Sequence, residues 1–168
     1  MKNCMLAIMK YYVHNDLEKE IRGYGTGMSD RMLIEIIYQM LKAMKILKEY
    51  GIVHHDIKLG NVLIVSNNPL KIALTDFEFA EILEDGEYTQ SNLGTPLYMS
   101  PEILLKKEHG AEVDMWALGV CAYRLASKNY PFNLSRKDEF KDVNRKILNY
   151  RLSFPGCFFR KRPKELIE

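Results

Sequence analysis

The sequence has few cysteines and no long apolar run, the features that are typical of secreted and membrane proteins. It has only three cysteines in 168 residues, and Cys4, Cys121 and Cys157 are too far apart for a zinc site or a disulfide framework. The apolar run from Cys4 to Met9 has six residues, too few for a signal peptide or a membrane span. We therefore expect an intracellular, cytoplasmic protein with no membrane contact.

A strong charge of either sign is also absent. Lysine and arginine number 24 against 22 acidic residues, so the net charge is only +2. Such a chain offers no electrostatic footprint for nucleic acid, and its one basic cluster, residues 160–164, is typical of a solvated tail. With 47% apolar and 27% charged residues, the composition is that of one folded globular domain.

The glycines do not form a phosphate-binding loop of the usual spacing. Residues 23–27 (GYGTG) hold three of the ten glycines, but they do not follow the pattern G-x-G-x-x-G. We interpret this stretch as a flexible linker. It separates a short helix expected over 17–22, which Asp16 caps, from a longer helix that begins after Ser29.

The apolar pattern predicts a domain in which helices outnumber strands. Six residues at three- and four-residue spacing form one stripe of a helix over 31–50: Leu33, Ile37, Met40, Leu41, Met44 and Leu47. A helix over 113–126 is apolar on nearly every side and should be enclosed by other elements. Shorter helices are expected from Pro101 and over 138–150, and the tail over 156–168 is ambiguous.

Strands are expected in only a few places. Residues 4–12 are typical of a short buried strand, and residues 62–65 and 71–75 should form a hairpin around the polar turn at 66–69. Residues 76–99 are polar and irregular over a long stretch, which is typical of a functional loop rather than a core connection.

Residues with the chemistry of phosphoryl transfer gather around the expected hairpin. Residues 54–61 (HHDIKLGN) precede its first strand, and residues 76–78 (DFE) follow its second. Transfer of a phosphate needs an acceptor for the hydroxyl proton, a cation near the phosphate and oxygen ligands for Mg²⁺. The hairpin and its flanks supply all of these groups: Asp56, Lys58, Asn61 and Asp76. We expect the two segments to converge on one site.

These segments resemble the motifs of the eukaryotic-type protein kinase family. HHDIKLGN is similar to the catalytic loop H-R-D-x-K-x-x-N, and DFE is similar to D-F-G. Residues 94–102 (GTPLYMSPE) resemble the end of an activation segment, residues 114–119 (DMWALG) the start of the buried central helix, and residues 130–132 (YPF) the loop after it. The resemblance covers residues 4–155. It implies an α+β kinase fold that is mainly helical, with a short hinge strand and a small β hairpin that carries the catalytic loop.

The resemblance implies a role for each residue of the site. Asp56 would be the catalytic base and Lys58 would neutralise the transferred phosphate; a lysine at this position points to serine/threonine substrates. Asn61 and Asp76 would hold Mg²⁺, and Thr95 would lie beside Asp56 and face the protein substrate. The implied activity is that of a transferase, which moves a phosphate from ATP to a protein hydroxyl.

The same resemblance outlines an ATP site at the hinge strand. Met9 would be the gatekeeper, and backbone groups of Lys10 and Tyr12 would meet the adenine. Asp16 would contact the ribose, and Leu63 would pack under the adenine ring.

Other matched residues imply structural or regulatory roles. His54 and Phe77 would build an internal spine, and Asp114 would anchor the backbone of the catalytic loop. Glu102 would lack the arginine with which the family pairs it. Three hydroxyl side chains in the activation segment are candidate phosphorylation sites: Tyr88, Thr89 and Ser91.

Two substitutions and one absence depart from the family pattern. Glu78 replaces the glycine of D-F-G, and His55 replaces the arginine that often receives an activation-loop phosphate. The glycine-rich loop and its strand lysine are not among the 168 residues. We therefore expect a partial kinase domain over 1–168 that lacks most of the N-terminal lobe. A regulatory protein, or N-terminal lobe sequence supplied separately, is then a candidate partner beside the protein substrate.

Two functions stay open at this point. The first is a serine/threonine kinase domain that uses ATP and Mg²⁺, with the activity of the isolated chain in question. The second is a pseudokinase or scaffold that uses the helical lobe as a protein-binding surface. The retained site residues favour the first, whereas Glu78, His55 and the missing small lobe favour the second. A small-molecule kinase would not need GTPLYMSPE, which serves a peptide substrate.

Overall fold

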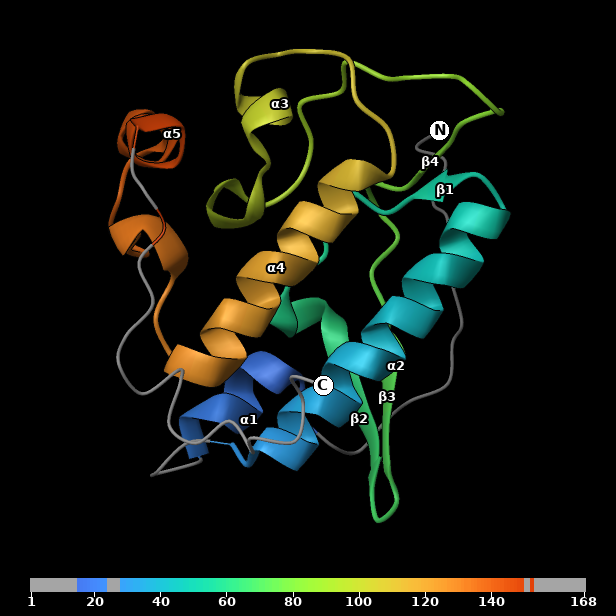
Figure 1. Ribbon diagram of the computed structural model, residues 1–168, viewed down its shortest axis with the longest axis vertical. Coiled ribbons are helices and arrows are strands. Elements are labelled where there is room, and N and C mark those ends of the chain that lie inside the picture. Colours follow the sequence, from blue (N-terminus) through green and yellow to red (C-terminus); the bar gives the residue numbers. More distant parts are fainter. Residues whose placement is uncertain (1–14, 24–27, 150–151, 153–168) are drawn as a thin grey trace, which may run out of the picture.

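The computed structural model describes residues 15–23, 28–149 and 152 of the chain. Within them it has five α-helices and two small antiparallel sheets, which confirms the predicted α+β class (Figure 1). The strand expected at 4–12 and the tail at 156–168 lie outside the described residues. None of the helices in the described part of the chain combines the length and the apolar character needed to cross a membrane.

Two long helices form the centre of the fold. α2 (Asp30–Glu49) and α4 (Glu112–Ser127) lie against each other, and α1 (Leu17–Gly23) lies near the C-terminal end of α4 (Figure 1). The side chains of Ser29 and Asp16 accept hydrogen bonds from backbone N–H groups in the first turns of α2 and α1, as N-caps do. The bounds of these helices agree with the predicted ranges to within one residue at each end.

The predicted hairpin packs against α2. β2 (Val62–Asn67) and β3 (Leu70–Leu74) pair in antiparallel fashion. The side chain of Gln39 in α2 donates to the carbonyl of Leu70 (2.9 Å) and accepts from the N–H of Ile72 (3.0 Å). These bonds fix the position of the hairpin relative to the helix in addition to the apolar contacts between them.

A second sheet joins two segments that flank the hairpin. β1 (Ile52–Val53) pairs with β4 (Glu81–Ile82) in antiparallel fashion. Residues 76–99 were predicted to be irregular, and the two residues of β4 correct this prediction; a strand of two residues is too short to show alternation. The pairing brings the segment after Asp76 alongside the strand that leads into the catalytic loop.

Shorter elements complete the lobe. α3 (Pro101–Leu104) and α5 (Phe140–Asn149) lie at the same end of the molecule (Figure 1). The described residues also include three 3₁₀ turns: η1 (Leu59–Asn61), η2 (Pro96–Tyr98) and η3 (Pro131–Asn133). Side chains from most of these elements meet in one apolar core, whose fully buried members include Leu17, Ile36, Ile57, Leu59, Val62 and Cys121. Burial raises the pKa of the Cys121 thiol, so this cysteine is a packing residue.

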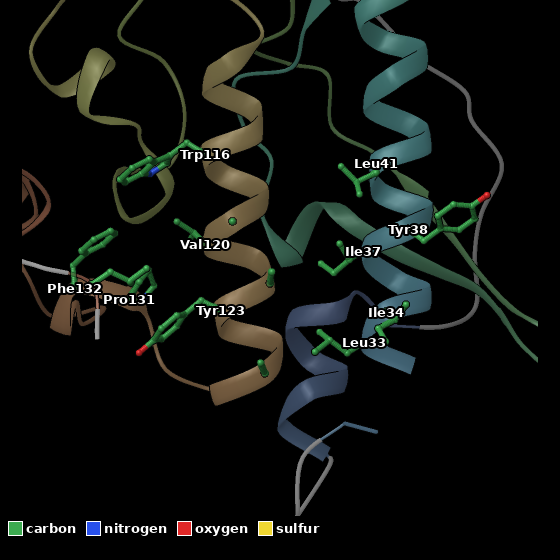
Figure 2. Close-up of a pocket in the computed structure, with 14 residues that line it drawn as sticks. Leu33, Ile34, Ile37, Tyr38, Leu41, Trp116, Val120, Tyr123, Pro131 and Phe132 are labelled. Carbon is green, nitrogen blue, oxygen red and sulfur yellow. The ribbon is translucent and has the colours of Figure 1, made fainter. Parts of the chain in front are cut away.

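An apolar groove of about 740 Å³ runs between α2 and α4 (Figure 2). Its lining includes Leu33, Ile37 and Leu41 of the stripe predicted for α2, and Leu41 is 40% exposed. The buried residues of α2 are Met40, which belongs to the predicted stripe, and Ile36, which the stripe left out. The predicted stripe was therefore partly wrong, because α2 has apolar residues on two neighbouring faces and spacing alone does not rank them.

The expectation that α4 is enclosed on every side also needs correction. Gly119 lines the groove, and Met115 is 52% exposed. The opposite face of α4 is buried as expected, with Leu118 and Cys121 in the core. Composition predicted the burial of α4 correctly overall, but the described residues do not cover its groove face.

Candidate active site

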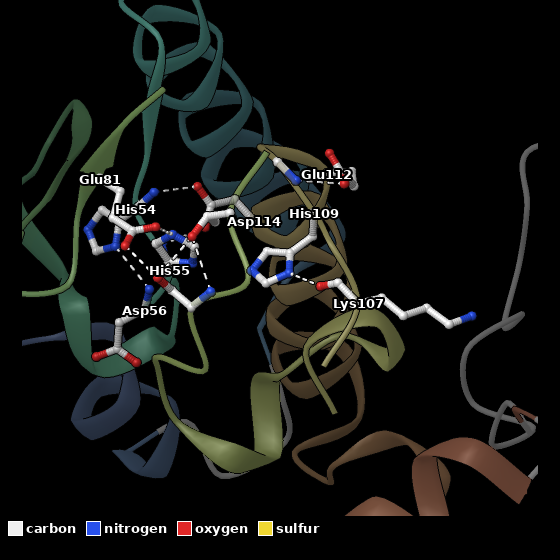
Figure 3. Close-up of polar contacts among 11 residues, drawn as sticks. His54, His55, Asp56, Glu81, Lys107, His109, Glu112 and Asp114 are labelled. Atoms are coloured by element: carbon white, nitrogen blue, oxygen red, sulfur yellow. Dashed lines mark hydrogen bonds and ion pairs between the residues drawn. The ribbon is translucent and has the colours of Figure 1, made fainter. Parts of the chain in front are cut away.

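Residues 54–58 connect β1 to η1, and buried hydrogen bonds fix their backbone. The carboxylate of Asp114 in α4 accepts the N–H of His54 (2.7 Å) and the N–H of His55 (2.9 Å), as Figure 3 shows. His55 has a φ of 63°, a left-handed conformation that costs a non-glycine residue on the order of 1–3 kcal/mol. The turn keeps this conformation because both N–H groups are held by one buried acceptor.

The carboxylate of Asp56 is the centre of the candidate site. Asp56 is 2% exposed, and its Oδ1 accepts the N–H (3.1 Å) and the hydroxyl (2.7 Å) of Thr95. Its Oδ2 accepts Nζ of Lys58 (2.6 Å) and the amide of Asn61 (3.0 Å). Each oxygen therefore has two donors, which is the full hydrogen-bonding capacity of a carboxylate.

The pKa of Asp56 lies below its usual range. Burial raises this pKa, but the hydrogen bonds from Lys58, Thr95 and Asn61, together with the charge of Lys58, outweigh burial. Asp56 is therefore ionised at neutral pH and is a weak base. Such a group orients a hydroxyl and accepts its proton once the oxygen is already forming another bond.

Hydrogen bonds join the catalytic loop to the segment that leads to Asp76. The amide of Asn61 donates to the carbonyl of Asp56 (2.9 Å), and the backbone carbonyl of Asn61 accepts the N–H of Thr75 (3.0 Å). The ring of His54 accepts the N–H of Asp56 on Nδ1 (3.3 Å) and donates from Nε2 to the carbonyl of Thr75 (3.2 Å), because a carbonyl can only accept. Asp76, the next residue, therefore lies beside the catalytic loop.

Asp76 faces solvent at this junction. It is exposed, and its φ of 65° is again left-handed for a non-glycine residue. Phe77 is 47% exposed and its ring lies 4.7 Å from that of His54, while Glu78 is exposed. No group of three or more histidine, cysteine, aspartate or glutamate side chains is arranged around a possible metal position in the part of the chain that the structure describes.

Gly94 lets the activation segment lie directly against the catalytic loop. Its φ is 103°, and a Cβ at this position would collide with the carbonyl oxygen of His55. The next residue is Thr95, which binds Asp56 and whose hydroxyl also accepts Nζ of Lys58 (3.1 Å). The close approach at the glycine therefore places the threonine within reach of both charged groups.

Glu81 in β4 links the activation segment to the catalytic loop. Its carboxylate accepts the hydroxyl of Ser91 (2.5 Å) and lies 3.0 Å from Nε2 of His55 (Figure 3). Thr89 donates its hydroxyl to Ser91 (2.9 Å) and forms a β-bridge with His109. Burial raises the pKa of Glu81, but the hydrogen bonds to its carboxylate and the neighbouring His55 have the larger effect. The pKa therefore lies below its usual range, and the carboxylate is ionised at neutral pH.

Replacing Ser91 with glutamate is expected to lower the free energy of unfolding by about 1–2 kcal/mol, because it removes a donor and sets a second carboxylate against Glu81. Gln90→Glu makes the same change of charge at the exposed neighbouring residue and is the matched control. Equal thermal unfolding curves for the two variants would contradict the expectation. Phosphorylation of Ser91 should for the same reason weaken the link.

The remaining predicted residues lie at other points of the lobe. Asp16 and Leu63 form an isolated β-bridge, so the residues expected at the ribose and the adenine are neighbours. Glu102 is half-buried in α3, and Tyr88 is 63% exposed. Three residues expected at the adenine lie outside the described residues: Met9, Lys10 and Tyr12.

Sequence reasoning missed two residues of this network, Glu81 and His109. Neither belongs to a motif, and His109 is 1% exposed with its ring 5.8 Å from that of His55.

Comparison with known proteins agrees with this arrangement. The chain matches the model of the protein kinase domain over residues 1–165. It is 36% identical over 149 residues to an Aurora kinase of Eremothecium gossypii, with 88% of this chain and 39% of that protein covered. It is 35% identical over 146 residues to serine/threonine-protein kinase D2 of Homo sapiens, with 86% and 16% covered.

A third relative covers more of the chain. Serine/threonine-protein kinase dkf-2 of Caenorhabditis briggsae is 34% identical over 165 residues, which are 98% of this chain and 13% of that protein. The chain thus spans between 13% and 39% of the length of these three relatives. The family model matches almost the whole chain, and these relatives are 34–36% identical to it. The chain therefore belongs to the protein kinase family.

Proposed function

We propose that this chain is a serine/threonine kinase domain that transfers the γ-phosphate of ATP to a hydroxyl group of a protein. The observation that carries the proposal is the hydrogen-bonded cluster around Asp56. Lys58 and Thr95 both donate to its carboxylate, and Lys58 also donates to the hydroxyl of Thr95. Enzymes accelerate phosphoryl transfer mainly through positioning and charge. This buried cluster offers both a fixed acceptor for a proton and a movable cation.

The substrate hydroxyl would take the place of one donor on Asp56. Lys58 is the donor best able to leave, because its side chain is 29% exposed whereas Asn61 is buried. Nζ of Lys58 would then turn to the phosphate that is transferred. The O–H bond of the substrate breaks as its oxygen bonds to phosphorus; the proton passes to Oδ2 of Asp56, and ADP leaves with the electron pair of the broken P–O bond.

Oxygen atoms at the junction of the two segments fit a magnesium ion. Asn61 uses its amide N–H groups on Asp56, and its Oδ1 has no hydrogen-bond partner among the described residues. The carboxylate of Asp76 is exposed one residue beyond the Thr75 bond to Asn61. Mg²⁺ prefers such hard oxygen ligands and takes the rest from phosphate and water. When bound, it would offset the charge of the phosphates, so we assign it to Asn61 and Asp76.

We assign the nucleoside end of ATP to the place where Asp16 adjoins Leu63. The N–H of Ile64 donates to the carbonyl of Asn15 (3.1 Å), which ties the start of α1 to β2. The ribose would contact Asp16, whose carboxylate is already ordered by Lys19 (2.9 Å), and the adenine would pack on Leu63. The adenine-facing residues outside the described part would be Met9, Lys10 and Tyr12.

Thermal unfolding with and without Mg·ATP tests the metal and nucleotide assignment. At a concentration one hundred times its dissociation constant, a bound ligand adds about 2.7 kcal/mol to the stability. We expect Asp76→Asn to lose most of this gain, because it removes a charged ligand of the ion. Asp85→Asn, at an exposed position in the loop after β4, is the matched control and should keep the gain. An equal gain in both variants would disprove the assignment.

A scaffold without catalysis is the second candidate function. The exposed carboxylate of Glu78 beside Asp76 favours it, because another negative charge near the phosphates opposes their binding. The groove between α2 and α4 would offer such a scaffold an apolar surface. Transfer of label from γ-labelled ATP to a general protein substrate separates the two functions, since only the kinase supports it.

A further inference from the structure

A cationic pocket lies outside the site described above. It has a volume of about 400 Å³, and its lining comes from α1, from the C-terminal end of α4 and from Arg136. We call this cavity the cationic pocket. It is lined by Glu18, Ile21, Arg124, Lys128 and Arg136. Three positive side chains therefore face one carboxylate. The excess of positive charge makes the pocket attractive to a further anion.

The buried arginine of this pocket already holds a carboxylate. Arg124 is 7% exposed, and its Nη2 donates to Oε1 of Glu18 at 2.6 Å. Arg136 donates to the same oxygen. Nε of Arg124 is buried and has no hydrogen-bond partner among the described residues. Two guanidinium groups offer ten N–H donors, far more than one carboxylate can accept, so donors are left for a second anion.

Ring contacts connect the cationic pocket to the activation segment. The guanidinium of Arg124 lies 4.0 Å from the ring of Tyr130, and this ring meets that of Tyr98 edge-on at 5.8 Å. The N–H of Tyr98 donates to the carbonyl of Thr95 (2.9 Å), and Thr95 binds Asp56. The pocket is thus joined to the residue that binds Asp56 through two aromatic rings, and an extended substrate peptide, which advances about 3.3 Å per residue, would run from Asp56 toward it.

We propose that the cationic pocket binds the carboxylate of an aspartate or glutamate in the protein substrate, a few residues from the hydroxyl that is phosphorylated. Arg136 and Lys128 would meet the carboxylate, while Arg124 and Glu18 hold the wall of the pocket in place. Ile21 would pack against the methylene groups of the incoming side chain. This inference rests on the proposed kinase function and names the substrate class that the site selects.

Peptide substrates test this preference directly. A serine in a neutral background is flanked in turn by glutamate, glutamine or lysine at each of about five positions on either side, and kcat/KM is measured. We expect one position at which glutamate is preferred to lysine about tenfold, with a smaller preference at high salt. Arg136→Glu, at a residue whose side chain is 52% exposed, should reverse the preference at that position. Lys141→Glu, an exposed change of the same charge on α5, should not.

The outcomes separate the two proposals. If the neutral peptide is phosphorylated but glutamate and lysine are equivalent at every position, the pocket proposal is overturned and the kinase function stands. If no peptide is phosphorylated, the kinase function fails, and fluorescence anisotropy of the labelled glutamate and lysine peptides then decides the pocket alone. Equal affinities in that assay overturn it, and tighter binding of the glutamate peptide that Arg136→Glu reverses supports it.

Discussion

Replacing Asp56 with asparagine is expected to lower kcat for phosphate transfer by a factor of about 10² to 10⁴. The amide cannot take the proton of the substrate hydroxyl. It also puts N–H groups where one oxygen now accepts hydrogen bonds, so either Lys58 and Asn61 or Thr95 would face a donor instead of an acceptor. Both the proposed proton acceptor and the position of Lys58, which we assign to the transferred phosphate, would be lost.

The rate is measured with γ-labelled ATP and a protein substrate at saturating concentrations of both. Mg·ATP should still stabilise the Asp56→Asn variant, because Asp76 is unchanged and the bond from the amide of Asn61 to the backbone carbonyl of Asp56 remains. Asp85→Asn serves again as the exposed control and should keep its full rate. A rate for Asp56→Asn within about threefold of the unchanged chain would show that this carboxylate is not the base.

The centre of the site could be predicted from the sequence because its contacts are local. Lys58 and Asn61 lie two and five residues from Asp56, so a short motif holds three of the interacting groups. Thr95 lies 39 residues away, and only the resemblance to a family motif placed it beside Asp56. Gly94 permits that approach because any side chain there would collide with His55, and only the coordinates show this.

Contacts between distant segments without a motif could not be predicted. Glu81 binds Ser91 across ten residues and His55 across 26, and Arg124 binds Glu18 across 106. No periodicity connects such pairs, since each depends on how separate elements pack. The prediction of the buried face of α2 was partly wrong for a related reason. Apolar spacing predicts a helix and its apolar positions, but the elements packed against the helix decide which of these positions are buried.

Asp114 carries the second large expected effect, on stability. We expect Asp114→Asn to lower the free energy of unfolding by about 3 kcal/mol, because an amide can accept only one of the two buried N–H groups and opposes the other with its own N–H. Burial raises the pKa of the Asp114 carboxyl, and the two hydrogen bonds from the backbone offset only part of this effect. Asparagine has the same shape, and the loss therefore reports the hydrogen bonds rather than packing.

The loss of these bonds should also release the left-handed turn at His55, because the hydrogen bonds to Asp114 offset the backbone strain of this residue. Thermal unfolding should show a decrease in Tm of roughly 6–12 °C for a chain of this length, and kcat should fall because Asp56 follows the relaxed turn. Asp142→Asn, on the half-exposed side of α5, should change the stability by less than about 0.5–1 kcal/mol. A variant of Asp114 as stable as that control would mean that the two backbone groups find other acceptors, and that α4 does not set the conformation of the catalytic loop.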